Sequence, residues 1–81
     1  MTTMGETIMY YRKAKGLSGL ALASAAGISG PMLSQIETGK RTPSLAALRR
    51  ISAALAVPVG DLLGAEERVE LTTKGEEAVT P

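Results

Sequence analysis

Apolar residues recur at helical spacing through the first 63 positions of the chain, and short stretches with glycine, serine or proline separate them. The clearest apolar stripe lies in the fourth such segment, at Leu45, Leu48, Ile51 and Leu55. No run of alternating polar and apolar residues, the pattern of a half-buried strand, occurs before residue 65. The pattern predicts an all-α fold for this region.

Residues that favour helix starts and helix ends divide the region into five expected helices. Ser18, Ser29 and Ser44 can accept hydrogen bonds from the free amides of a first helical turn. Gly16, Gly27 and Gly39 are residues at which helices commonly end. The expected helices cover about residues 5–15, 19–26, 30–38, 45–55 and 59–63, with Gly64 closing the last.

The composition removes several kinds of chemistry. The 81 residues include no cysteine and no histidine, so disulfides, thiol nucleophiles, the usual general base and most zinc ligands are missing. We therefore expect no bound metal, no cofactor and no enzymatic activity. No apolar run approaches the ~20 residues of a membrane span, and the N-terminus lacks a signal-peptide layout. These features predict a cytoplasmic protein that does not contact a membrane.

Charge is distributed unevenly although the net charge is only +1. Residues 1–64 carry seven basic and three acidic side chains, a net charge of +4. Residues 65–81 carry two basic and five acidic side chains, a net charge of −3. The sequence therefore predicts a basic domain at residues 5–63 followed by an acidic C-terminal tail at residues 64–81, either mobile or associated with dimerisation.

The second and third expected helices carry the main functional motif. They are joined by a tight turn around Gly27 and Ile28, and Ala23 allows the two helices to cross closely. This spacing of small and apolar residues predicts a helix-turn-helix over residues 19–38.

Residues 5–63 resemble the phage-repressor-type (Cro-like, Xre-like) helix-turn-helix family. The resemblance rests on the segments RKAKGLS, LALASAAGIS, MLSQIETGKRTPSLAALRRISAALAVP and DLL. It implies a compact five-helix bundle of the lambda-repressor-like type, whose third helix enters the major groove of double-stranded DNA. The resemblance also implies a transcriptional regulator of a prokaryote, phage or plasmid, and within that role it favours a repressor. Such a protein would bind a palindromic operator as a homodimer.

The resemblance also suggests which residues contact DNA. The expected base-reading positions of the third helix are Ser29, Gly30, Pro31, Ser34, Gln35 and Thr38. The expected phosphate contacts are Ser18, Gly19, Met32, Lys40 and Arg41. A glutamine amide can both donate to and accept from adenine, so Gln35 is the expected main reader. Arg12 and Glu37 are expected to form a partly buried ion pair that fixes the third helix.

Four positions differ from the usual family pattern. Members commonly carry a glycine at the end of the fourth helix, where this chain has Ala56. They also commonly carry glutamine where this chain has Gly19, and polar or basic residues where it has Gly30 and Pro31. Proline suits the first helical turn because the amides there have no intrahelical acceptor. Losing these side chains leaves an alternative open, in which the same fold serves as an antitoxin or another protein-interaction module. In that case a toxin or other protein would bind the acidic tail. A transcriptional regulator bound to DNA would be associated with the nucleoid.

Overall fold

The computed structural model describes residues 3–63, and these form five helices and no strand. The helices are α1 (Met4–Ala14), α2 (Gly19–Ala26), α3 (Gly30–Glu37), α4 (Leu45–Leu55) and α5 (Val59–Leu62). The all-α prediction is confirmed for this part of the chain, and each expected boundary lies within one residue of the observed one. Residues 64–81, the predicted acidic tail with Gly64 at its start, lie outside the described residues.

Hydroxyl side chains begin the first four helices. Ser18, Ser29 and Ser44 each accept a hydrogen bond from an amide in the following turn, as the sequence predicts. Thr3 does the same for α1, and the Glu6 carboxylate accepts from the Thr3 amide in return. This reciprocal capping box explains why α1 begins at Met4, one residue earlier than expected.

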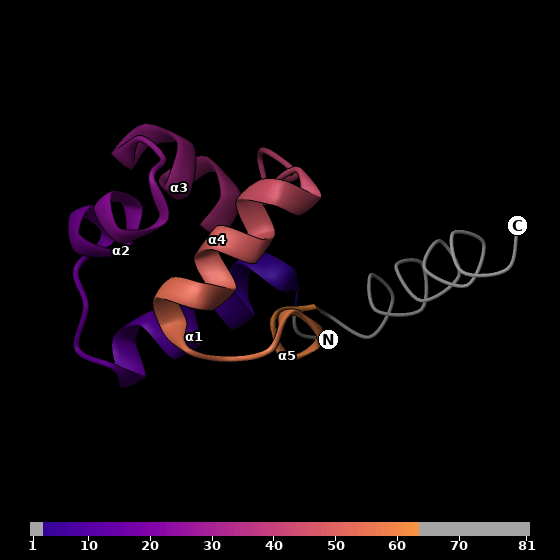
Figure 1. Ribbon diagram of the computed structural model, residues 1–81. Coiled ribbons are helices and arrows are strands. Elements are labelled where there is room, and N and C mark those ends of the chain that lie inside the picture. Colours follow the sequence, from indigo (N-terminus) through magenta and orange to yellow (C-terminus); the bar gives the residue numbers. More distant parts are fainter. Residues whose placement is uncertain (1–2, 64–81) are drawn as a thin grey trace, which may run out of the picture.

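The five helices pack together into one bundle (Figure 1), and their buried aliphatic side chains form its core. Helix α2 packs against α3 and α4, while α1 packs against α3 and α5, and α5 also contacts α4. The largest fully buried side chains are Ile8, Leu22, Leu33, Ile36, Ile51, Leu55 and Leu62. Every helix contributes to this set, so burial of the core fixes the positions of α2 and α3 relative to the rest of the bundle.

Gly5 allows α1 to approach the end of α3 closely. A Cβ atom at this position would collide with the backbone carbonyls of Ile36 and Glu37. Because those carbonyls belong to the last helical turn of α3, even an alanine at position 5 would push the two helices apart. Gly5 therefore helps to set the position of α3.

Helices α2 and α4 end in the same way although their end residues differ. Gly27 has φ 70° and Ala56 has φ 58°, both in the left-handed region. In each case the amide of the next residue bonds five residues back, from Ile28 to Ala23 and from Val57 to Ser52. Glycine adopts this conformation freely, whereas a Cβ atom makes it costly at Ala56.

Replacing Ala56 with glycine should therefore stabilise the protein. Relief of the left-handed strain exceeds the extra unfolded-state entropy of glycine, which leaves a net gain of about 0.5–1 kcal/mol. Thermal unfolding should show a melting temperature higher by roughly 2–8 °C. The matched control is Gly27→Ala, for which the melting temperature should fall; an unchanged or lower value for Ala56→Gly would show that Ala56 is not strained.

Candidate nucleic-acid interface

Helices α2 and α3 form a helix-turn-helix joined by residues 27–29. The turn is closed by the Ile28 amide, which donates to the Ala23 carbonyl at 2.9 Å. Ala23 and Ala26 are buried on α2, which packs against both α3 and α4, and their small side chains permit close packing there. The motif predicted for residues 19–38 is therefore present.

Helix α3 has two chemically different faces. Leu33 and Ile36 are buried in the core on one face, together with the side chain of Glu37. The opposite face exposes Pro31, Ser34, Gln35 and Thr38, four of the six residues predicted to read bases. The polar face is thus available for contact with a partner molecule.

The first turn of α3 presents backbone rather than long side chains. The Ser29 hydroxyl oxygen accepts from the Met32 amide at 3.1 Å, and Pro31 has no amide hydrogen to satisfy. The Gly30 amide has no acceptor within residues 3–63. A free amide at the positive end of a helix dipole favours an acceptor with negative charge, so it can donate to a base edge in the groove as well as to a phosphate.

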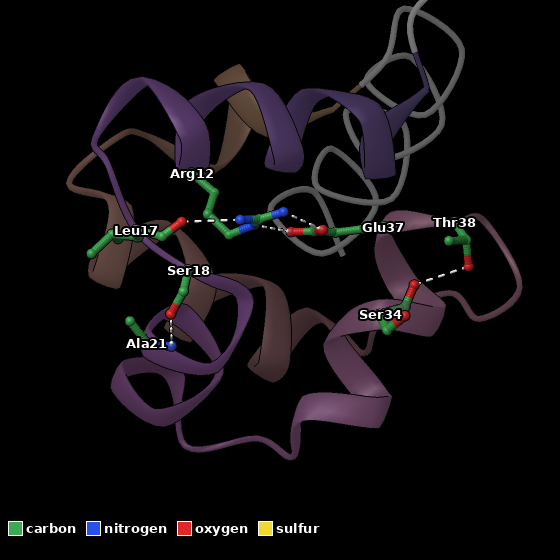
Figure 2. Close-up of polar contacts among 7 residues, drawn as sticks. All are labelled: Arg12, Leu17, Ser18, Ala21, Ser34, Glu37 and Thr38. Atoms are coloured by element: carbon green, nitrogen blue, oxygen red, sulfur yellow. Dashed lines mark hydrogen bonds and ion pairs between the residues drawn. The ribbon is translucent and has the colours of Figure 1, made fainter.

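Met32 fits its predicted phosphate contact poorly. Its amide is already bonded to Ser29, and its side chain packs against the core. Ser18 and Gly19, in contrast, lie at the exposed start of α2, where Ser18 accepts from the Ala21 amide at 3.0 Å (Figure 2). The hydroxyl hydrogens of Ser18 and Ser29 stay free to donate, because each oxygen acts as an acceptor in its cap.

An open hollow of about 410 Å³ lies between the start of α2 and the side of α3 that carries Gly30, Leu33 and Glu37. Its lining comes from three helices and consists of Arg12, Gly19, Leu20, Gly30, Pro31, Leu33, Ser34 and Glu37. Leu20 is 76% exposed, and its Cδ2 atom lies 3.2 Å from where a Cβ at Gly30 would be. Gly19, Gly30 and Pro31, three of the four positions that depart from the family pattern, thus meet in one place beside an exposed leucine.

The loop after α3 folds back onto Gln35. The amides of Lys40 and Arg41 donate to the Gln35 carbonyl at 2.8 and 3.1 Å. The Thr38 hydroxyl donates to the Ser34 carbonyl at 2.9 Å (Figure 2). The Arg41 guanidinium also donates from Nε to the Gln35 side-chain oxygen at 3.0 Å, a contact that the sequence does not predict. Gln35, which is predicted to read a base, and Arg41, which is predicted to contact a phosphate, are therefore hydrogen-bonded to each other.

Arg12 and Glu37 form the predicted ion pair in two-pronged geometry (Figure 2). Arg12 Nε lies 2.8 Å from Glu37 Oε2, and Nη2 lies 3.1 Å from Oε1. Arg12 Nη1 also donates to the Leu17 carbonyl at 3.0 Å. The side chains are only 14% and 7% exposed, and the hydrogen bond to Glu37 raises the pKa of Arg12 further above its already high ordinary value. Arg12 therefore keeps its positive charge in this contact.

Arg50 also makes a structural contact that the sequence does not indicate. Its Nε donates to the Ala26 carbonyl at 3.1 Å and so bonds the C-terminal end of α2 to α4. A cation is favourable at this end of a helix. The two partners lie 24 positions apart in the sequence, so no local pattern indicates this contact.

Between Thr3 and Leu63, no group of three or more histidine, cysteine, aspartate or glutamate side chains is placed to hold a metal ion. Within the same range no helix has the length and apolar character needed to cross a bilayer.

A family model described as Helix-turn-helix matches residues 8–62. The chain belongs to the phage-repressor-type (Cro-like, Xre-like) helix-turn-helix family. The match covers α2, α3, α4 and α5 entirely. The family membership, like the five-helix lambda-repressor-like fold, agrees with the sequence prediction.

Individual members of the family are similar to the chain in sequence and in structure. It is 42% identical to the HTH-type transcriptional regulator SlrR of Bacillus subtilis (strain 168) over 76 residues, which are 91% of this chain and 50% of SlrR. The chain thus spans about half the length of this relative.

Two solved structures resemble the fold. The P22 c2 repressor in complex with a synthetic operator matches with a TM-score of 0.74 and 32% identity, over 78% of this chain and 96% of that one. A complex of the SinR and SinI proteins matches with a TM-score of 0.74 and 35% identity, over 96% and 80% of the two chains.

Removing one member of the Arg12–Glu37 pair should destabilise the bundle. Arg12→Met or Glu37→Met leaves a mostly buried charge without its partner, which costs on the order of 3 kcal/mol. The double variant leaves no orphaned charge, so its loss should be smaller than the sum of the two single losses by at least about 1 kcal/mol. Urea unfolding of the wild type, the two single variants and the double variant measures this coupling. If the losses in unfolding free energy of the single variants simply add up in the double variant, the two side chains do not stabilise each other.

Proposed function

We propose that this protein is a transcriptional regulator, acting as a repressor, that binds specific double-stranded DNA with α3 in the major groove. The observation that carries the proposal is the exposed polar face of α3, held in a helix-turn-helix. A structurally similar protein, the P22 c2 repressor, has been solved with operator DNA. A helix with one buried and one polar face can lie in a major groove without losing its own packing.

The proposed contacts divide into two kinds. Base edges would be read from the first turn and outer face of α3, by Ser29, Gly30, Pro31, Ser34, Gln35 and Thr38. Phosphates would be bound on both sides of that helix, by Ser18, Gly19, Lys40 and Arg41. Met32 is left out of the second group because its amide and side chain are already engaged. Phosphate contacts fix the position of the helix, and base contacts give the sequence preference.

A homodimer on a palindromic operator completes the proposal. Two copies would place their α3 helices in successive major grooves about 34 Å apart. The apolar residues in and around α5 suggest a dimer interface. Leu62 and Leu63, however, are buried in the protein's own core. Val57 and Val59 are only partly buried and are the apolar side chains left there for a partner. Sedimentation with and without a palindromic duplex tests this part, and a single copy per saturated duplex would refute it.

A regulator of this kind would act in the cytoplasm, associated with the nucleoid while bound to DNA, and it would bind rather than catalyse. Fluorescence imaging of a tagged chain that does not follow the nucleoid would contradict the first statement.

A second candidate function is recognition of a protein partner. The similar SinR protein has been solved in a complex with SinI. In this chain an exposed leucine, Leu20, lies beside the hollow formed around Gly30 and Pro31. An antitoxin would combine such a contact with operator binding. Leu20→Ser should then weaken the binding of a co-purifying protein partner. Unchanged binding of that partner would show that the hollow beside Leu20 is not its binding site.

Gln35 and Lys40 should affect DNA binding in different ways. Gln35→Ala should relax the preference at one base position of each half-site, worth roughly 1–3 kcal/mol, and should leave the salt dependence nearly unchanged. Lys40→Ala should weaken binding to all sequences alike and reduce the slope of log affinity against log salt by about one. Selection from randomised DNA, followed by titrations at several salt concentrations, measures both effects. Wild-type base preferences in Gln35→Ala would mean that α3 is docked differently.

A further inference from the structure

The side-chain amide of Gln35 already has a partner in the protein alone. Arg41 donates from Nε to the Gln35 Oε1 atom at 3.0 Å. A guanidinium carries only donors, so the end of the amide that faces Arg41 must be the oxygen. The Nε2 amino group is then the end that remains without an acceptor within residues 3–63.

Backbone contacts fix the position of Arg41 relative to Gln35. The Gln35 carbonyl accepts from the amides of Lys40 and Arg41 at 2.8 and 3.1 Å, and from the Thr38 hydroxyl at 3.3 Å. Three donors therefore hold the loop over the last turn of α3 before the two side chains meet. This local closure reduces the entropy lost when the Arg41 and Gln35 side chains pair. Lys40 provides the contrast, because its ammonium group takes part in no hydrogen bond or ion pair of the described residues.

We infer that Arg41 is a positioning residue that orients Gln35 to read guanine rather than adenine. This inference rests on the proposed function and names the base that Gln35 would read. A free glutamine suits adenine, since its oxygen accepts from the adenine N6 amino group while its amino group donates to N7. When Arg41 holds the Gln35 oxygen, the two side chains together offer mainly hydrogen-bond donors to a base. These donors are the Gln35 amino group and the guanidinium N–H groups other than the one on Nε.

Guanine matches such a cluster, because its major-groove edge offers two acceptors, N7 and O6. Adenine places an amino group where guanine has O6. That group would approach the positive guanidinium, which already occupies one of the two lone pairs of the Gln35 oxygen, so the adenine contact is weaker than one made by a free glutamine. Arg41 would thus contribute to the choice of base as well as to phosphate binding.

The experiment compares the full chain with three variants on two duplexes. A selection from randomised DNA first defines the preferred site and the base position that responds to Gln35→Ala. Binding is then measured to that duplex and to the duplex with guanine and adenine exchanged at this position. Arg41→Ala removes the positioning contact, and Lys40→Ala is the matched control for loss of one neighbouring positive charge. Circular dichroism confirms that the variants keep their helices.

The wild-type chain should prefer guanine over adenine at the responsive position by roughly 5- to 150-fold. Lys40→Ala should bind both duplexes more weakly and keep this ratio. Arg41→Ala should lose the guanine preference and shift towards adenine, because the Gln35 oxygen becomes free to accept from N6. Gln35→Ala should show little preference between the two bases.

Two results would overturn the inference while the proposed function stands. One is a ratio of affinities for the guanine and adenine duplexes that is the same in Arg41→Ala as in the wild type. Arg41 would then be a phosphate contact only. The other is a wild-type preference for adenine at the responsive position. A wild-type chain with no sequence preference at any position would instead refute the proposed function, and the inference with it.

Discussion

One guanidinium group connects three segments that meet at the base of the helix-turn-helix. Arg12, on α1, bonds through two nitrogens to the Glu37 carboxylate and through the third to the Leu17 carbonyl. Glu37 is the last residue of α3, and Leu17 immediately precedes the N-cap of α2. The orientation of both helices of the motif therefore depends on one nearly buried cation.

This contact and the nearby close approach at Gly5 determine which face of α3 remains free. The absence of a Cβ atom allows α1 to lie against the carbonyls of the last turn of α3, and Arg12 then neutralises the carboxylate that this packing buries. Together they hold the Leu33 side of the helix inward, so the Gln35 side faces away from the core. Affinity for DNA would depend on residues that never touch it, because a tilted α3 would misplace every base contact at once.

The sequence predicts helix positions well because the caps are local. A serine followed by a helical apolar stripe needs no distant partner to begin a helix, and the starts of α2, α3 and α4 agree with this. The Arg12–Glu37 pair could be expected only through the family resemblance, since its members are 25 positions apart. Arg41 could not be assigned to Gln35, because that contact depends on how the loop closes over α3. The exposure of Leu20 was missed for a similar reason: periodicity marks a leucine as apolar and does not tell which side of so short a helix is covered.

The central claim is that the outer face of α3 and its two flanking segments form one DNA-binding surface. Amide chemical-shift mapping by NMR, with a duplex obtained by selection added to the labelled chain, tests this claim most directly. We expect the largest changes at residues 18–20, 29–35 and 38–41, with small changes along α5 and the exposed side of α1. Changes concentrated on α1 and α5, with α3 unaffected, would contradict the account.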